Sequence, residues 1–263
     1  MKMLLLMWLV TVPAWRAANV TAQSNDHSQY VSPWKTPWDY DGPRGADHWS
    51  ELDKAYSVCN SGQEQSPIDI RDPRKAKLPA LRFEYKTEAV NYIINNAHTI
   101  RVNYHDAAGA GSYLVVGNKR YQLTQFHFHR PSEEFVKGKS YDMVLHLMHQ
   151  GNDGEIVGVA VLLTAGSMNR TIQQIWDHMP AHEGQEAVPG LEINPAELLP
   201  KAHGYYLYKG SQTAPPCTEG VFWYVLKTPV ELAQEQINAF AAIYPRDVRP
   251  VQPLNGRTVL ESE

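Results

Sequence analysis

The sequence is poor in features that would cross-link the chain, anchor it or give it a strong charge. Its 263 residues include only two cysteines, which form either one disulfide or two separate buried thiols. The formal charge is −4 and no long basic run occurs, so nothing indicates a nucleic acid or an anionic membrane as a partner. No internal repeat or linker-like stretch divides the chain after Trp38. These absences favour a single domain, although the length alone also fits two small ones.

The N-terminus carries an apolar run that is too short to span a bilayer. Lys2 precedes this run, and small residues at 20–22 follow it as a signal-peptidase site. We therefore expect a signal peptide at 1–22, a flexible polar leader at 23–37 and a folded domain at 38–260. Because the C-terminal residues are polar and no later apolar stretch occurs, we expect an exported protein, periplasmic or secreted, without a stable membrane anchor.

Short segments rich in β-branched and aromatic residues dominate the middle of the chain, and they predict strands. These segments are residues 91–95, 99–104, 113–116, 120–129, 156–163, 205–209 and 221–227. Gly117-Asn118 and Asn152-Asp153-Gly154 suit tight turns between neighbouring strands. Many strands joined by hairpins favour a mainly β (α+β) single domain, built on a mostly antiparallel sheet with a few peripheral helices.

Two amphipathic segments predict those helices. An apolar stripe at helical spacing covers residues 172–179, with Asn169 or Ser167 as its N-cap. The second helix starts with a capping box at residues 228–231, where proline occupies the first helical position, and it ends near Ile243.

Three histidines on strand-like segments predict a metal site. Alternate side chains of a strand share a face, so His127 and His129 lie together while Phe126 and Phe128 pack on the other side. If the strand that carries His146 is adjacent, three imidazoles converge. Three neutral histidines leave the fourth position of a tetrahedral zinc open to water, as in a catalytic site. The alternative is a set of buried histidines that are merely hydrogen-bonded in the core.

Two other classes of metal protein fit the histidines less well. His127-x-His129 followed by Glu133 resembles the first ligand cluster of the cupins, but the Pro-x-Gly segment of the second cluster is absent around His146. A zinc protease is disfavoured because no His-Glu-x-x-His motif occurs.

Eight short motifs, in order along the chain, resemble the alpha-class carbonic anhydrases over nearly all of residues 38–257. They are Asp47-His48-Trp49, Gln65-Ser66-Pro67-Ile68-Asp69-Ile70, Asn95-Asn96-Ala97-His98-Thr99, Gln125-Phe126-His127-Phe128-His129, Pro131-Ser132-Glu133, Leu145-His146-Leu147-Met148-His149, Thr213-Ala214-Pro215-Pro216-Cys217-Thr218-Glu219 and Arg249-Pro250-Val251-Gln252-Pro253-Leu254-Asn255.

The resemblance implies a large twisted sheet with a conical cavity that ends at zinc. In this family zinc lowers the pKa of its bound water to near 7, so hydroxide attacks CO₂ and yields bicarbonate and a proton. The zinc ligands fall on His127, His129 and His146. Thr213 matches the threonine that orients the hydroxide, and Glu133 matches the carboxylate that takes the threonine's own hydrogen.

Further positions match the family's cavity. His98 falls on the proton shuttle, a role that suits histidine because its pKa lies near neutral pH. Tyr40 and Asn96 fall on the lining of the water chain, and Gln125 is well placed to hold His127. The apolar wall where CO₂ rests falls on Val157, Val221 and Trp223. Without the family, a surface histidine in a hairpin would be the favoured interpretation of His98.

The exported, two-cysteine form resembles the bacterial periplasmic and other secreted branches of the family, in which Cys59 and Cys217 would be bridged. The partners implied are the small molecules CO₂ and bicarbonate. The sequence leaves the oligomeric state open, a homodimer included.

Three departures from the family pattern surround the expected site. The family usually has a glutamate two residues before the third zinc ligand, His146, and here that residue is Val144. Gln212 replaces the usual leucine before Thr213, and Ala214 replaces the usual threonine after it. Valine cannot accept a hydrogen bond, so we expect His146 to lack a carboxylate partner for its free N–H. We expect Val144 and Gln212 to reduce zinc affinity and turnover while the ligand set stays intact. The alternative is a low-activity or non-catalytic member that acts as a binding protein.

Overall fold

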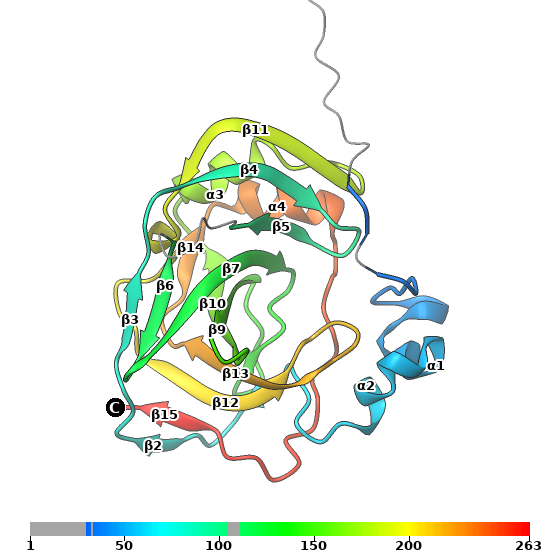
Figure 1. Cartoon of the computed structure of the whole chain (residues 1–263), viewed down its shortest axis with the longest axis vertical. Coiled ribbons are helices and arrows are strands. Elements are labelled where there is room, and N and C mark those ends of the chain that lie inside the picture. Colours follow the sequence, from blue (N-terminus) through cyan, green and yellow to red (C-terminus); the bar gives the residue numbers. More distant parts are fainter. Residues whose placement is uncertain (1–29, 33, 105–110) are drawn as a thin grey trace, which may run out of the picture.

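The computed structural model describes residues 30–32, 34–104 and 111–263 (Figure 1). The expected signal peptide, 1–22, lies outside these residues, as do 23–29 and residue 33 of the expected leader. Within the described ranges, no helix combines the length and the apolar character that a membrane crossing requires.

In the described part of the chain, one large, twisted sheet of 13 strands forms the body of the domain (Figure 1). Its main path runs in the order β11 (Gly184–Ile193), β4 (Glu88–Asn95), β5 (Ile100–Asn103), β7 (Lys119–His129), β9 (Met143–Gly151), β10 (Ile156–Ala165), β13 (Glu219–Leu226), β12 (Tyr205–Ser211), β15 (Leu260–Ser262), β2 (Arg74–Ala76). Three further strands join it: β14 (Val230–Leu232) pairs with β10, while β3 (Leu81–Glu84) pairs with β6 (Tyr113–Val116), which pairs with β7.

The mainly β fold is confirmed, and each of the seven predicted strand segments overlaps a strand of this sheet. Most neighbouring strands are antiparallel, but β10 runs parallel to β13 and to β14. The sheet is therefore mixed at its centre. A separate parallel pair, β1 (Asp69–Ile70) with β8 (Phe135–Val136), holds the segment that follows β7.

Two longer helices, α3 (Arg170–Trp176) and α4 (Gln234–Ile243), cover one face of the sheet. The side chain of Asn169 caps α3, as expected, by accepting the backbone N–H of Ile172 at 3.0 Å. The Phe128 ring from β7 packs against both helices. Its centroid lies 4.6 Å from that of Trp176 in α3 and 6.4 Å from that of Phe240 in α4. These contacts bury the apolar face of β7.

The predicted start of α4 is wrong. Residues 230–232 form β14, which pairs with the end of β10, so the chain there is extended and not helical. The helix begins only at Gln234, and Gln236 accepts the backbone N–H of Ala233 at 3.2 Å. Val230 and Leu232 alternate with a polar residue, which is a strand pattern. Residues 163–165 of β10 lie beyond its pairing with β13, so they are available to pair with this strand.

A bulge in β7 separates two halves of the strand. The register with β9 shifts between Leu123 and Gln125, which leaves Thr124 as the extra residue. Leu123 faces the main hydrophobic core, and so do Phe126 and Phe128 beyond the bulge. The bulge therefore turns Gln125 and the two histidines of β7 to the opposite face of the sheet.

Short helices on the N-terminal side pack around a disulfide. They are η2 (Gly42–Arg44), η3 (Ala46–His48), α1 (Trp49–Leu52), η4 (Lys54–Tyr56) and α2 (Val58–Ser61); η5 (Pro195–Leu198) lies elsewhere, after β11. Cys59 of α2 is bonded to Cys217 in the loop after β12, and both lie in a cluster with Trp38 and Trp49. Of the two alternatives that the sequence left for these cysteines, the structure therefore has the disulfide and not two separate thiols.

The last residues of the expected leader contact the domain. Trp34 packs edge-on against Trp38, with ring centroids 5.3 Å apart. The hydroxyl of Thr36 donates to Asp53, and Tyr56 donates to the Thr36 carbonyl at 2.9 Å. Ordered contacts therefore begin before residue 38, the expected start of the domain.

Candidate metal centre

Neighbouring strands bring the three predicted histidines together. His127 of β7 lies directly opposite His146 of β9, and His129 follows two residues later on the same face. One nitrogen from each imidazole lies within 4.8 Å of the corresponding nitrogens of the other two. The predicted convergence of the three rings is confirmed.

Each ring is held through its other nitrogen. His127 Nδ1 donates to Gln125 Oε1 at 2.9 Å, and His129 Nδ1 donates to the Asp247 carbonyl at 2.7 Å. His146 Nε2 lies 3.0 Å and 3.2 Å from the two carboxylate oxygens of Glu134. These acceptors select the tautomer of each ring. The nitrogens that remain, Nε2 of His127 and His129 and Nδ1 of His146, are the ones that can bind a metal.

The donor set fits a zinc ion. His129 Nε2 and His146 Nδ1 are buried and have no hydrogen-bond partner among the described residues, which is costly unless something else binds them. Burial, and then the neighbouring imidazoles, lower the pKa of His127 and His129 well below the ordinary value, so both are neutral ligands. For His146, burial is outweighed by Glu134 and Glu133, and its pKa is raised. Three histidine nitrogens suit zinc, which in catalytic sites keeps one position open.

The Glu133 carboxylate lies beside the free nitrogens. Its Oε2 is 3.7 Å from His129 Nε2 and 4.0 Å from His146 Nδ1, while its Oε1 accepts the backbone N–H of Arg249 at 2.8 Å. Burial raises the pKa of Glu133 to about 7, and the hydroxyl of Thr213 is among the neighbours that oppose this rise. The structure thus brings Glu133 and Thr213 together next to the three histidines.

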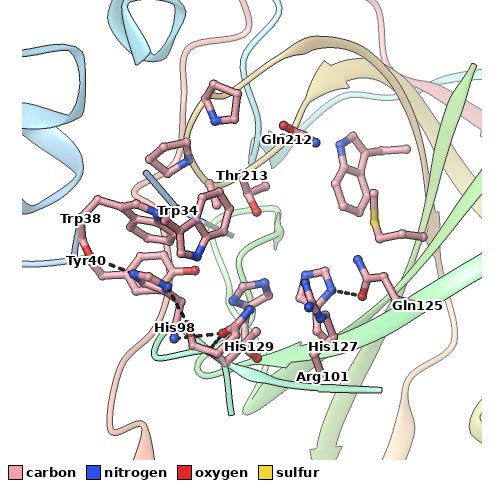
Figure 2. Close-up of a pocket in the computed structure, with 17 residues that line it drawn as sticks. Trp34, Trp38, Tyr40, His98, Arg101, Gln125, His127, His129, Gln212 and Thr213 are labelled. Atoms are coloured by element: carbon pink, nitrogen blue, oxygen red, sulfur yellow. Dashed lines mark hydrogen bonds between the residues drawn. The ribbon is translucent and has the colours of Figure 1, made fainter. Parts of the chain in front are cut away.

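A cavity of about 240 Å³ opens above the histidines (Figure 2). Its lining includes the predicted residues Tyr40, Asn96, His98, Gln125, His127, His129, Gln212, Thr213, Ala214 and Trp223. Figure 2 shows His127 and His129 at one end, with Thr213 across from them and Gln212 farther away on the same side. His146 is fully buried and is not among the residues that line the cavity.

His98 lies in an aromatic wall of the cavity (Figure 2). Its ring stacks on Trp38 with a centroid distance of 3.6 Å, and Trp34 and Tyr40 meet it edge-on. Both ring nitrogens contact backbone carbonyls, Nε2 that of Trp38 at 2.8 Å and Nδ1 that of Asn96 at 3.2 Å. Burial lowers the pKa of His98, although the two carbonyls, which favour a protonated ring, oppose this, so the ring is neutral at pH 7. A neutral ring has a single N–H and donates to one of the two carbonyls.

Comparisons with known proteins agree with this site. Residues 44–263 match the eukaryotic-type carbonic anhydrase family. A carbonic anhydrase of Nostoc sp. is 39% identical over 231 residues, covering 86% of this chain and 86% of the relative. One from Neisseria gonorrhoeae is 40% identical over 227 residues, covering 86% and 88%. The solved alpha-carbonic anhydrase of Thermovibrio ammonificans, in complex with the inhibitor sulfanilamide, has a TM-score of 0.81 and 41% identity, covering 86% of this chain and 99% of its own.

The chain belongs to the alpha carbonic anhydrase family. It is therefore an enzyme of the carbonic anhydrase class, and its three-histidine site can hold the metal ion that this class uses.

One prediction about this alpha carbonic anhydrase site is wrong. We expected Val144 to leave His146 without a carboxylate partner, but Glu134 supplies one at 3.0 Å. Val144 is fully buried and packs in an apolar cluster with Ala160 and Leu162. The loss of the family's strand glutamate is thus offset by a carboxylate from the segment between β7 and β8.

The expected apolar wall needs a second correction. Val157 lies opposite His149 on the face of β10 that joins the main core, so it does not face the cavity. Its neighbour Gly158 lies on the cavity face, where a Cβ atom would meet the Trp223 ring at 2.5 Å. Val221 shares the face of Trp223 but is buried and does not line the cavity. Trp223 lines it, and its ring lies 4.6 Å from that of His146.

Sequence reasoning missed several residues of this carbonic anhydrase site. Met148 lines the cavity, and its position two residues after His146 on one strand face would have indicated this. Arg101, directly opposite His127 across β5 and β7, also lines it. Glu134 directly follows the matched motif Pro131-Ser132-Glu133, but nothing in the sequence indicated that its carboxylate contacts His146. The Asp247 carbonyl that holds His129 left no signal, because any residue supplies a carbonyl.

Proposed function

We propose that this protein catalyses the reversible hydration of CO₂ to bicarbonate and a proton, with zinc held by His127, His129 and His146. The observation that carries the proposal is the set of three imidazole nitrogens that face one point, while the other nitrogen of each ring is hydrogen-bonded to a fixed acceptor. When bound, zinc acidifies a coordinated water, so that hydroxide is available as a nucleophile toward CO₂ at neutral pH.

Glu133 and Thr213 orient the reacting oxygen. The buried Glu133 carboxylate accepts only hydrogen bonds when charged, so it takes the hydroxyl hydrogen of Thr213. The Thr213 oxygen is then left to accept a hydrogen bond from the nucleophile, which directs a lone pair of the nucleophile at the carbon of CO₂. Trp223 and Met148 provide apolar surface in the same cavity, where uncharged CO₂ is favoured over water.

His98 carries the released proton from the cavity to solvent. The ring is neutral at pH 7 because burial lowers its pKa, so it can accept a proton. Tyr40 and Asn96 line the cavity beside it and offer polar groups to connecting waters. The transfer requires the ring to release the Trp38 carbonyl, which holds its Nε2 at 2.8 Å.

The protein acts after export, in an oxidising compartment. The Cys59–Cys217 bridge supports this, because structural disulfides persist where thiols are not kept reduced. The short apolar run after Lys2 supports it independently, as a secretory signal.

A His129→Ala variant tests the proposed centre. We expect the parent to bind one zinc per chain and to hydrate CO₂ in a stopped-flow assay, and the variant to lose most zinc and activity. The matched control is His149→Gln, since His149 is also a buried β9 histidine but faces away and contacts the Tyr85 hydroxyl at 2.6 Å. Full zinc in His129→Ala, or its loss in His149→Gln, would contradict the ligand assignment.

A further inference from the structure

A buried carboxylate next to the metal centre has no role in the reaction described above. Glu134 is fully buried, and its two oxygens lie 3.0 Å and 3.2 Å from Nε2 of His146. We propose that Glu134 is the positioning residue of the third metal ligand, that it replaces the strand glutamate absent at Val144, and that it sets how tightly and how long zinc is held. The inference rests on the proposed zinc function, which it deepens.

The local fold fixes Glu134 over the imidazole. The backbone N–H of Phe135, the next residue, bonds to the Ile68 carbonyl at 3.2 Å, and β8 pairs with β1 from that point. The carbonyl of Glu134, in the same peptide unit, accepts the Ser132 hydroxyl at 2.8 Å. The residue that carries the carboxylate is therefore followed by a peptide unit whose N–H and C=O are both hydrogen-bonded. It can hold the His146 ring in one orientation at a small entropic cost.

The environment of Val144 explains why the carboxylate comes from elsewhere. Val144 shares the strand face of His146, but its neighbours Ala160, Leu162 and Val225 are apolar and fully or almost fully buried. A glutamate there would be surrounded by these apolar side chains and would depend on the His146 N–H for a polar partner. It would also compete with Glu134 for the single N–H of His146.

The consecutive residues Glu133 and Glu134 thus have different partners at the site. Glu133 contacts the Arg249 N–H and the hydroxyl of Thr213, on the substrate side. Glu134 contacts His146 on the side of the ring away from the free Nδ1. One short segment after β7 therefore orients both the threonine and a metal ligand.

Zinc affinity of Glu134 variants tests the proposal. Glu134→Ala should weaken zinc binding about 10–100-fold in competition with a chromogenic chelator and shorten the half-life of bound zinc. Glu134→Gln keeps the volume and one acceptor oxygen but not the charge, so we expect a smaller loss. The visible spectrum of the cobalt-loaded protein should also change in Glu134→Ala, because the ligand ring is no longer held.

Relocation of the carboxylate separates positioning from general stability. The Glu134→Val/Val144→Glu double variant should recover part of the zinc affinity that Glu134→Ala loses, whereas Val144→Glu alone should not tighten binding. The matched control is Glu186→Gln, which breaks a histidine–carboxylate contact of 2.9 Å with His178 outside the site and should leave zinc affinity unchanged. Metal-free melting temperatures establish that each variant folds.

The outcomes distinguish this inference from the proposed function. A parent protein that binds no zinc would refute the proposed function itself. If the parent binds one zinc, but folded Glu134→Ala and Glu134→Gln hold it as tightly and for as long, the role of Glu134 is refuted. Tighter zinc binding by Val144→Glu alone would also overturn it, because the site would then have lacked a carboxylate partner.

Discussion

Removal of the Cys59–Cys217 bridge is the perturbation whose magnitude follows most directly from the structure. The bridge joins positions 158 residues apart and ties α2 to the loop after β12. A crosslink that closes a loop of this length restricts the unfolded chain, which corresponds to about 5 kcal/mol at 25 °C. We expect the Cys59→Ala/Cys217→Ala double variant to lose up to this amount of unfolding free energy.

Denaturation by guanidinium chloride measures the loss. With a slope of about 5 kcal/mol/M, a change of 5 kcal/mol moves the midpoint by on the order of 1 M. A reducing agent should shift the parent to the midpoint of the double variant and leave the variant itself unchanged. A loss below about 1 kcal/mol with an unchanged slope would refute the entropic argument.

Activity should survive the same change at 25 °C. Without the disulfide, hydrogen bonds still hold the loop that carries Thr213. Gln65 donates to the Cys217 carbonyl at 3.1 Å, and the Gln212 N–H donates to the Thr218 carbonyl at 2.9 Å. We therefore expect kcat/KM of the folded double variant to stay near that of the parent. A large fall would show that the bridge itself positions Thr213.

The histidine centre was predictable because its spacing depends on local strand geometry alone. Alternation places His127 and His129 on one face wherever the strand lies, and only its pairing with the strand of His146 remained to be found. Gln125 was expected to hold His127 because a metal-binding histidine needs an acceptor for its other nitrogen, and the 2.9 Å contact confirms it. Local patterns sufficed wherever both partners belonged to one strand.

Features that depend on register were not predictable. Alternation along β10 does not say which face meets the cavity; the pairing of Ala160 with His146 decides it, and it places Val157 on the core face. The bulge at Thr124 had no sequence signal either, since alternation extended from His127 back to Leu123 would place both on one face. A shift of one residue reverses every side chain beyond it.

Contacts between distant segments were the least predictable. Glu134 reaches His146 across 12 positions, and the Asp247 carbonyl reaches His129 across 118. The start of α4 belongs to the same class, because the free edge of β10 and not a local preference makes residues 230–232 a strand. Tertiary packing decides all three.

Three further substitutions test the site and its surroundings. His98→Ala should lower kcat more than kcat/KM, by up to about 10²-fold at low buffer, with partial recovery by imidazole; an unchanged kcat would contradict the shuttle role. Gln212→Leu should raise kcat/KM several-fold if the half-buried amide disfavours CO₂, and an unchanged value would mean that the amide points away from the substrate. The third change, His149→Gln, tests stability at acid pH. Burial lowers the pKa of His149 to about 3. The unfolded state, with a histidine pKa near 6.5, binds the proton more tightly, so His149 destabilises the fold as the pH falls from 6.5 toward 3. Between pH 6.5 and 5 this amounts to about 1.5 kcal/mol. His149→Gln should therefore lose that much less unfolding free energy than the parent over this interval in denaturant titrations, because glutamine has no proton to bind. Parallel pH profiles of the two proteins would show that His149 titrates alike in the folded and unfolded states, and the burial argument would fail.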